Sequence, residues 1–378
     1  MGILWAPRST ASECRDRHAD PGDKHMAVDS FNSALAQHQS GDLTEAERLY
    51  RQVVAGAPDH AAALHNLGML VQSRGQLQEA GDLLARAVAS NPDDATCHNN
   101  LGSVLRELGR LSEAVAAYRA AVQTDPDYVN AYFNLASALM DAGEPQAAVD
   151  CYGRILSLAP DDREALGELG IAMMTLGKPS EAIANFRRAV TLGPNDQVAH
   201  YNLATAYKEE HRPDAALASY GRALAIDPGY AAAHNNIGML LKAKGDFEQS
   251  AHAFRAALSA NPGHIPAHVN LISLLLEQKD PETAEAQCRS ALEIDADDPG
   301  VLSNLGATLL ELRRWQEAAD SYGQVLRLVA NDVPARLGLA AALMGLHQHG
   351  KAEQLLRRAP WTSTPSTPGC VACWAMFW

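Results

Sequence analysis

Asparagine recurs along this 378-residue chain at a spacing that suits hydrogen bonding to a peptide backbone. A side-chain amide offers two N–H donors and one carbonyl acceptor, so it can pair with both polar groups of a peptide unit. The series steps by 34 residues and comprises Asn32, Asn66, Asn100, Asn134, Asn202, Asn236, Asn270 and Asn304. Glu168 and Gly338 interrupt it. We therefore ask which elements would align these amides.

A pair of short amphipathic helices is predicted around Asn100. Leucine and valine recur at three- and four-residue spacing from 95 to 108, which predicts a first helix, and a second apolar stripe predicts another over 112–123. Gly109 separates the two helices and Pro126 ends the second. Neither helix can bury its apolar face alone, so the hairpin needs neighbours.

The same hairpin repeats along the chain with a period of 34 residues. The period is seen in the prolines Pro58, Pro92, Pro126, Pro160, Pro194, Pro228 and Pro262. Small residues such as Gly102 and aromatic residues such as Tyr118 keep the same step, and ten units span 27–366. The eighth unit departs, with Ile272 at the small position and Cys288 at the aromatic one. Several registers locked to one period predict an all-α solenoid, in which each unit packs on its neighbours.

These registers resemble the tetratricopeptide repeat. The period of 34, Leu101-Gly102 in the first helix, Gly109 before the second helix, and then Ala114, Tyr118, Ala121 and Pro126 carry the resemblance. It implies about ten helix-turn-helix repeats stacked as a right-handed superhelix, with the first helices on the concave side. It also implies that the asparagines face that concave groove.

The repeats divide the chain into three parts. We expect a disordered N-terminal segment over 1–26, the repeat solenoid over 27–360, and a Ser/Thr/Pro linker with a short apolar tail over 361–378. The tail from Cys370 to Trp378 continues no helical pattern. A membrane or partner contact, a truncated junction and an out-of-frame end all remain open for it.

The charge balance restricts the classes of partner. Forty-five Asp and Glu residues against 31 Lys and Arg residues give a net charge of −14. Nucleic acids and anionic membranes need a basic surface, so neither is an expected partner. The six cysteines form no disulfide framework, which favours a reducing, cytoplasmic location. Cys97, Cys151 and Cys288 fall within predicted helices, where a thiol acts as a small apolar group.

Histidines and basic residues also recur near the asparagines. His98, His200, His234 and His268 share one register, which places them too far apart to bind one metal ion, so we expect packing roles. Arg106, Lys208 and Lys242 are the expected cations of the groove, too sparse for the dense carboxylate clamp of some family members. No catalytic, phosphate-binding or zinc motif appears, so we expect no enzyme activity, metal or small-molecule cofactor.

The sequence thus predicts a protein-interaction scaffold that binds an extended peptide or protein segment in its groove. The expected peptide-binding residues are Asn66, Asn100, Asn134, Asn202, Asn236, Asn270 and Asn304. Asparagine is also common at this position in tetratricopeptide repeats generally, so the series alone does not prove a binding role. The chain is also similar to the repeat arm of O-linked N-acetylglucosamine transferases. The alternative function is therefore a substrate-recognition arm that lacks its catalytic domain.

Overall fold

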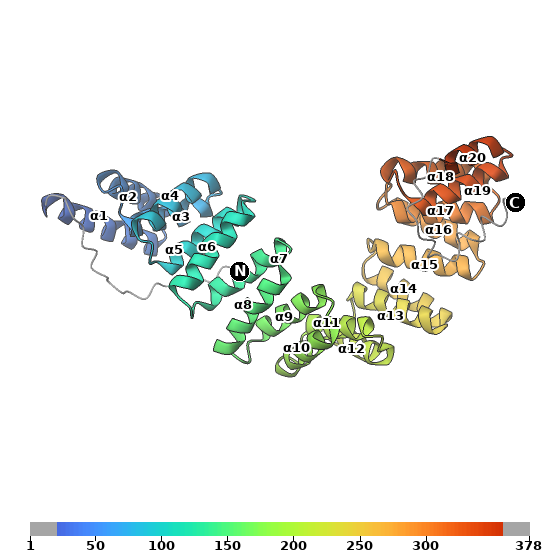
Figure 1. The fold of residues 1–378 in the computed structure, drawn as a ribbon, viewed down its shortest axis with the longest axis horizontal. Coiled ribbons are helices and arrows are strands. Elements are labelled where there is room, and N and C mark those ends of the chain that lie inside the picture. The colour runs from blue at the N-terminus through green and yellow to red at the C-terminus, as the bar shows by residue number, and fades with distance from the viewer. Residues whose placement is uncertain (1–20, 358–378) are drawn as a thin grey trace. The chain divides into compact units, whose positions relative to one another are not determined.

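The computed structural model describes residues 21–357, in which every regular element is an α-helix (Figure 1). The helices belong to two units, residues 1–192 and 193–378. The predicted all-α repeat fold is confirmed. Residues 1–20 and 358–378 lie outside the described part, and with them the predicted linker and apolar tail. No helix in the described part is both long and apolar enough to cross a lipid bilayer.

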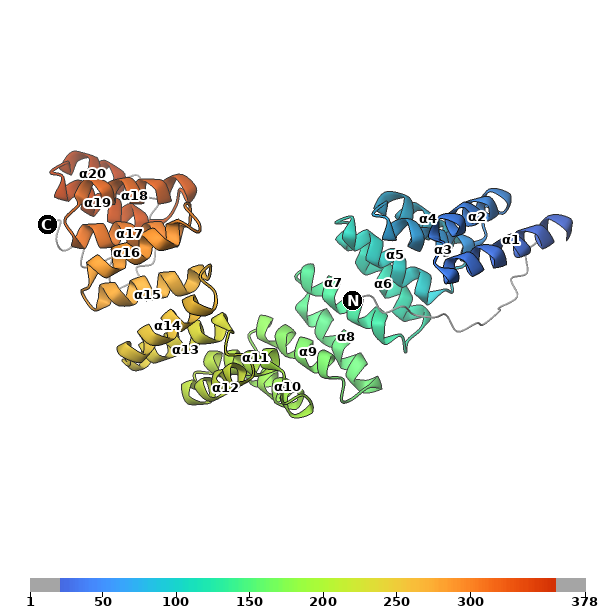
Figure 2. The ribbon, with the colours of Figure 1, turned by 180° about the vertical axis from the view of Figure 1, so that it is seen from behind.

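The first unit contains five helical hairpins (Figure 1; Figure 2 shows them from behind). They are formed by α1 (Pro21–Ser40) with α2 (Leu43–Gly56), α3 (Ala61–Ser73) with α4 (Leu77–Ser90), α5 (Ala95–Glu107) with α6 (Leu111–Thr124), α7 (Val129–Asp141) with α8 (Pro145–Leu158), and α9 (Arg163–Thr175) with α10 (Pro179–Leu192). The helices predicted over 95–108 and 112–123 are therefore correct to within one residue at each end.

The second unit contains five more hairpins of the same kind. They are formed by α11 (Gln197–Glu209) with α12 (Pro213–Ile226), α13 (Ala231–Lys244) with α14 (Phe247–Ala260), α15 (Ile265–Glu277) with α16 (Pro281–Leu292), α17 (Pro299–Glu311) with α18 (Trp315–Leu328), and α19 (Val333–Gly345) with α20 (His349–Arg357).

The start of the first helix differs from the prediction. Helix α1 begins at Pro21, so the expected boundary of the disordered segment at residue 26 falls inside this helix. Proline is well suited to a first helical position, because the N–H that it lacks has no partner there. The apolar pattern that marks the repeat begins only further along α1, so it could not locate this start.

Aspartates in the turns between hairpins start the first helices. The Asp94 carboxylate accepts a hydrogen bond from the Cys97 backbone N–H at 3.0 Å. Asp162 and Asp332 cap α9 and α19 in the same way. These caps satisfy backbone donors that a helix start leaves free. The acidic turns therefore fix where these first helices begin, whereas His60 and His264 cap α3 and α15.

Within each hairpin the two helices meet where a small residue faces a bulky one. A Cβ atom added to Gly102 would lie 2.7 Å from the Tyr118 ring, and one added to Gly238 would lie 2.6 Å from the Phe254 ring. In the eighth hairpin the sizes are exchanged, because Ile272 of α15 and Cys288 of α16 are both fully buried in one cluster. This exchange conserves volume, which explains why the departure seen in the sequence is compatible with the repeat.

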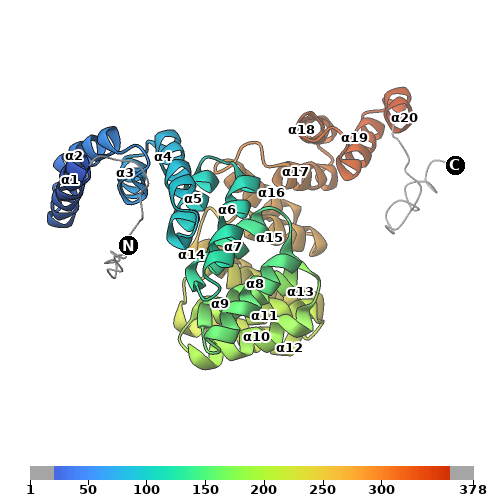
Figure 3. The ribbon, with the colours of Figure 1, turned by 60° about the vertical axis from the view of Figure 1, so that its left-hand side comes forward.

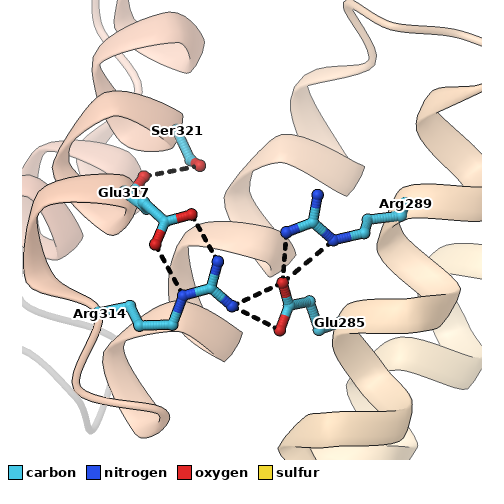
Figure 4. A network of polar contacts seen from close by, with 5 residues as sticks. All are labelled: Glu285, Arg289, Arg314, Glu317 and Ser321. Atoms are coloured by element: carbon cyan, nitrogen blue, oxygen red, sulfur yellow. Dashed lines mark hydrogen bonds and ion pairs between the residues drawn. The ribbon is translucent and has the colours of Figure 1, made fainter.

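Charged side chains connect successive second helices. The Glu285 carboxylate on α16 accepts from Arg289 and, at 2.7 Å, from Arg314, which precedes α18 (Figure 4). Arg314 also pairs with Glu317. The hydrogen bond from Arg289, and then that from Arg314, lower the pKa of Glu285. Seven repeats earlier Glu47, Arg51 and Glu79 occupy the same registers and also form ion pairs.

Replacing Gly102 with leucine tests the hairpin contact. We expect the free energy of unfolding to fall by about 1–3 kcal/mol, because the side chain has no space beside Tyr118. Gly153 is the matched control, since it lies within α8 and nothing lies within 4 Å of its added Cβ. Urea denaturation followed by circular dichroism should show no loss of stability for Gly153→Leu. Equal losses for both variants would contradict the packing argument.

Glu285→Gln tests the charged connection between second helices. We expect it to lower stability by about 1–2 kcal/mol at neutral pH, because two arginines lose their shared carboxylate. Since the pKa of Glu285 is lowered, the wild-type advantage should be present above its ordinary value and disappear as the pH falls through the folded-state pKa. The control is Glu317→Gln, whose side chain is 53% exposed against 15% for Glu285. A similar loss in the control variant would refute the special role of Glu285.

Candidate functional site

The candidate site lies where the first helices of consecutive hairpins meet within one unit. In the first unit α3 contacts α5 and α5 contacts α7, and in the second unit α13, α15, α17 and α19 follow one another in the same way (Figure 3). We call the surface that these helices share the first-helix face. Asn66, Asn100, Asn134, Asn236, Asn270 and Asn304 lie on these helices. Asn202 lies on α11, which the Asn236–Tyr201 hydrogen bond joins to α13, so we include α11 in the first-helix face of the second unit.

Five of the asparagines are hydrogen-bonded to the first helix of the preceding repeat. In every case the amide nitrogen donates to the residue 35 positions earlier in the chain. The bonds are Asn100 to His65 Nε2 (2.8 Å), Asn134 to Asn99 Oδ1 (2.8 Å), Asn236 to the Tyr201 hydroxyl (3.0 Å), Asn270 to Asn235 Oδ1 (2.9 Å) and Asn304 to the Val269 carbonyl (3.3 Å). The series therefore couples α5 to α3 and α7 to α5 in the first unit, and α13, α15 and α17 each to the first helix before it in the second unit.

The sequence shows the donors of these hydrogen bonds as a repeated register, but it does not show their acceptors. The acceptor is always the residue just before the asparagine of the preceding repeat, but its type changes from imidazole to amide, hydroxyl and backbone carbonyl. A register of changing residue types has no motif that a pattern search could find. The coupling role of the amides was consequently missed, although their alignment was predicted.

Asn66 and Asn202 depart from this pattern, and Asn236 makes a bond in addition to it. Asn66 hydrogen-bonds the Tyr50 hydroxyl of the preceding hairpin. Asn236 is 9% exposed and donates a second bond to the Tyr220 hydroxyl at 3.1 Å, so both of its N–H groups are used internally. Asn202 is half-buried and has no hydrogen-bond partner among residues 21–357. The amides therefore differ in what they can offer a ligand.

The half-buried amides retain free polar atoms. The carbonyl oxygens of Asn134, Asn270 and Asn304 accept no hydrogen bond from the described residues, and each amide keeps a second N–H. In that part of the chain no fully buried side-chain nitrogen or oxygen lacks a partner. The free carbonyl oxygens therefore contact solvent, and each of these three amides keeps one acceptor and one donor that the described residues do not use.

The cations expected on this face are paired with carboxylates. Arg106 contacts Asp141 at 2.6 Å and Lys242 contacts Glu277 at 2.6 Å, each one repeat further along. Lys208 lies 3.4 Å from Glu209. Because each positive charge has a negative partner, none of the three is available to hold the carboxylates of an acidic ligand without breaking an ion pair.

The recurring histidines stabilise the turns that precede their helices. His98, His200, His234 and His268 each place Nε2 2.8–3.0 Å from the carbonyl of the repeat proline six residues earlier. Where leucine or tyrosine replaces this histidine, an arginine 28 residues after the proline bonds the carbonyl instead, as Arg86, Arg154 and Arg188 do. Among the described residues no group of His, Cys, Asp and Glu could hold a metal ion.

The three cysteines within the described helices are buried and free. Burial raises the pKa of Cys97 to about 12 and that of Cys151 to about 11. Because the thiolate is the reactive form, these cysteines are apolar packing groups rather than nucleophiles. Cys14, Cys370 and Cys373 lie outside the described residues.

The helical hairpins and their shared face define a solenoid repeat protein, and the comparisons with known families specify the repeat. Profiles described as tetratricopeptide repeat match residues 37–101, 133–197, 198–230, 241–307 and 309–360, and one described as TPR repeat matches 102–143. The chain belongs to the tetratricopeptide repeat family. No curated protein matches the chain as a whole or in part.

Solved structures of other repeat proteins are similar to parts of the chain. The MamA protein is 27% identical, with 44% of this chain and 92% of MamA covered at a TM-score of 0.42. The pilF protein of Pseudomonas aeruginosa is 23% identical, with 53% and 93% covered at 0.47. A tetratricopeptide repeat protein from Parabacteroides merdae is 20% identical, with 67% and 99% covered at 0.47.

The contrast between Asn236 and Asn202 yields a prediction about stability. Asn236→Ala should lower the free energy of unfolding by about 1–3 kcal/mol, because the hydroxyls of Tyr201 and Tyr220 lose a donor. Asn202→Ala should change it by less than about 0.5 kcal/mol, because this amide has no partner in the described residues. Chemical denaturation of both variants measures the difference. A larger loss for Asn202→Ala would contradict the assignment.

Proposed function

We propose that the first-helix face binds an extended segment of another protein through that segment's backbone. The tetratricopeptide repeat fold is consistent with a protein-interaction scaffold. The observation that supports the finer proposal is that Asn134, and in consecutive repeats Asn270 and Asn304, keep a solvent-facing carbonyl oxygen and a second amide N–H. A backbone offers the same two groups at every residue, whatever its side chains.

The spacing of the repeats suits an extended chain. Packed helices lie about 8–10 Å apart, and an extended strand advances about 3.3 Å per residue. One asparagine could therefore meet roughly every third residue of the ligand. Because each net hydrogen bond contributes only about 0.5–1.5 kcal/mol, several repeats must act together.

Apolar side chains beside the amides favour an uncharged segment. In the second unit Val198 is 48% exposed and precedes Asn202 by one helical turn on α11, and Met239 of α13 is 40% exposed. Residues four apart share a helix face, so Val198 and Asn202 would contact the same ligand. The cations nearby are already paired, which disfavours an acidic ligand. We therefore propose a neutral segment with apolar side chains as the preferred partner.

The other parts of the sequence-based function stay predictions. They are the cytoplasmic location, the absence of nucleic-acid, membrane and cofactor binding, and the absence of enzyme activity. The alternative role as the substrate-recognition arm of a glycosyltransferase also stays a prediction.

Binding can be tested with a peptide selected from a random library displayed on phage. Asn202→Ala should weaken its affinity about two- to tenfold, the loss of one net hydrogen bond, while thermal stability is kept. Fluorescence anisotropy with the labelled peptide measures the change. The control is Gly221→Ala on the second helix α12, where an added Cβ meets nothing within 4 Å. The proposal fails if no peptide can be selected, or if both variants bind as the wild type does.

A further inference from the structure

A continuous chain of polar side chains crosses three first helices of the first unit. Asn134 of α7 donates to Asn99 Oδ1 at 2.8 Å, Asn99 of α5 donates to Asn100 Oδ1 at 3.4 Å, and Asn100 donates to His65 Nε2 of α3 at 2.8 Å. Asn99 is only 6% exposed. Four side chains from three repeats thus form one hydrogen-bonded series.

All of these bonds run in one direction. Each amide donates an N–H to the next residue toward His65. The Asn99 and Asn100 oxygens accept from the neighbour on the α7 side. The series ends on an imidazole nitrogen, which can accept only while it carries no proton. The observed direction of the series therefore requires an unprotonated His65 Nε2.

The surroundings of His65 favour its neutral form. Burial lowers its pKa, and the Asp94 carboxylate opposes this effect. Helices α2, α4 and α5 pack against α3, and Asp94 at the start of α5 is the charged group among the described residues that acts on this imidazole. The nearby His98 is not part of the series, since its ring is bonded to the Pro92 carbonyl.

We propose that His65, Asn100, Asn99 and Asn134 form a proton-operated relay that exchanges donor for acceptor on the first-helix face. When His65 gains a proton, Nε2 becomes a donor and Asn100 turns its oxygen toward it by rotating about the Cβ–Cγ bond. Asn99 and then Asn134 rotate for the same reason. All hydrogen bonds re-form in the opposite direction, and no other covalent bond changes.

The relay would regulate the proposed peptide binding, and this consequence rests on that proposed function. At neutral pH Asn134 Oδ1 accepts no hydrogen bond from the described residues and is available to a ligand N–H. After reversal this oxygen accepts from Asn99, and the Asn134 NH₂ group takes its place on the surface. A ligand N–H would then meet a donor, so a segment bound at neutral pH should bind more weakly at acidic pH.

The second unit contains a matched arrangement that lacks the proton switch. Four repeats further along, Tyr201, Asn235, Asn236 and Asn270 occupy the positions of His65, Asn99, Asn100 and Asn134. Asn270 donates to Asn235 and Asn236 donates to Tyr201, as in the first unit. However, Asn235 contacts the Met239 sulfur rather than Asn236, and a tyrosine hydroxyl keeps its proton near neutral pH. These amides should not respond to acidification.

Nuclear magnetic resonance of the full chain tests the relay without a ligand. The protein is labelled with ¹⁵N at asparagine and histidine, and the pH is lowered from about 7.5 to about 5, the range in which histidine titrates. The side-chain NH₂ signals of Asn99, Asn100 and Asn134 should shift with one midpoint, which equals that of His65 and lies below the ordinary histidine value of 6.5. The signals of Asn235, Asn236 and Asn270 should stay constant.

His65→Tyr is the decisive variant, because tyrosine occupies this position in the second unit. It should abolish the pH-dependent shift of the NH₂ signals of Asn99, Asn100 and Asn134. His98→Tyr, which copies Tyr132 in the next repeat, should leave that shift unchanged. The relay is refuted if the His65 signals shift with pH while the Asn134 NH₂ signals do not, or if the NH₂ signals of the three asparagines still shift in His65→Tyr.

Peptide affinity provides the second measurement and separates the two proposals. Between about pH 7.5 and about pH 5 a peptide bound by the first unit should lose about two- to tenfold in affinity for the wild type, and this loss should shrink in His65→Tyr. If the amides titrate together but no peptide binds, the relay stands and the proposed function fails. If a peptide binds and the same loss occurs in His65→Tyr, binding stands and the relay does not control it.

Discussion

The close contact between a small residue of the first helix and a bulky residue of the second is the constraint on which the rest of the structure depends. Where glycine faces an aromatic ring, as Gly102 faces Tyr118, the two helix axes can approach until the ring touches the backbone. This fixed approach orients each hairpin identically. Identical hairpins then place equivalent side chains of consecutive first helices side by side. This placement allows an asparagine side chain to donate a hydrogen bond to the residue 35 positions earlier.

The structural role of the amides and the binding role that we propose for them compete for the same atoms. Asn236 uses both of its N–H groups inside the protein, whereas Asn202 uses none in the described part. Asn134, Asn270 and Asn304 are intermediate, with one donor used and one acceptor free. The number of amide atoms left for the proposed ligand therefore differs from one asparagine to the next. The acceptor that its neighbour provides decides the balance in each repeat.

The fold was predictable because period, helix length and packing registers are properties of the local sequence. The helices around Asn100 and the 34-residue registers of Gly102, Tyr118 and the asparagines followed from spacing, and the common face of the asparagines followed from the family resemblance. The start of α1 at Pro21 did not, since it precedes the apolar pattern. The pairing of Arg106 with Asp141 and the bond from Asn100 to His65 also did not follow, because partners one repeat away share no fixed residue type. The sequence pattern therefore predicts the helices and their repeat registers, whereas the side-chain partners in neighbouring repeats are visible only in the packed structure.

We propose that the first-helix face recognises the backbone of an extended segment rather than its side chains. An N-methylation scan of a bound peptide tests this most directly, because each methyl group removes one backbone donor and leaves the side chain unchanged. The account predicts that affinity falls at roughly every third position, whatever residue is there, and that alanine substitutions at those positions cost less. Uniform tolerance of N-methylation, combined with large losses on alanine substitution, would contradict it.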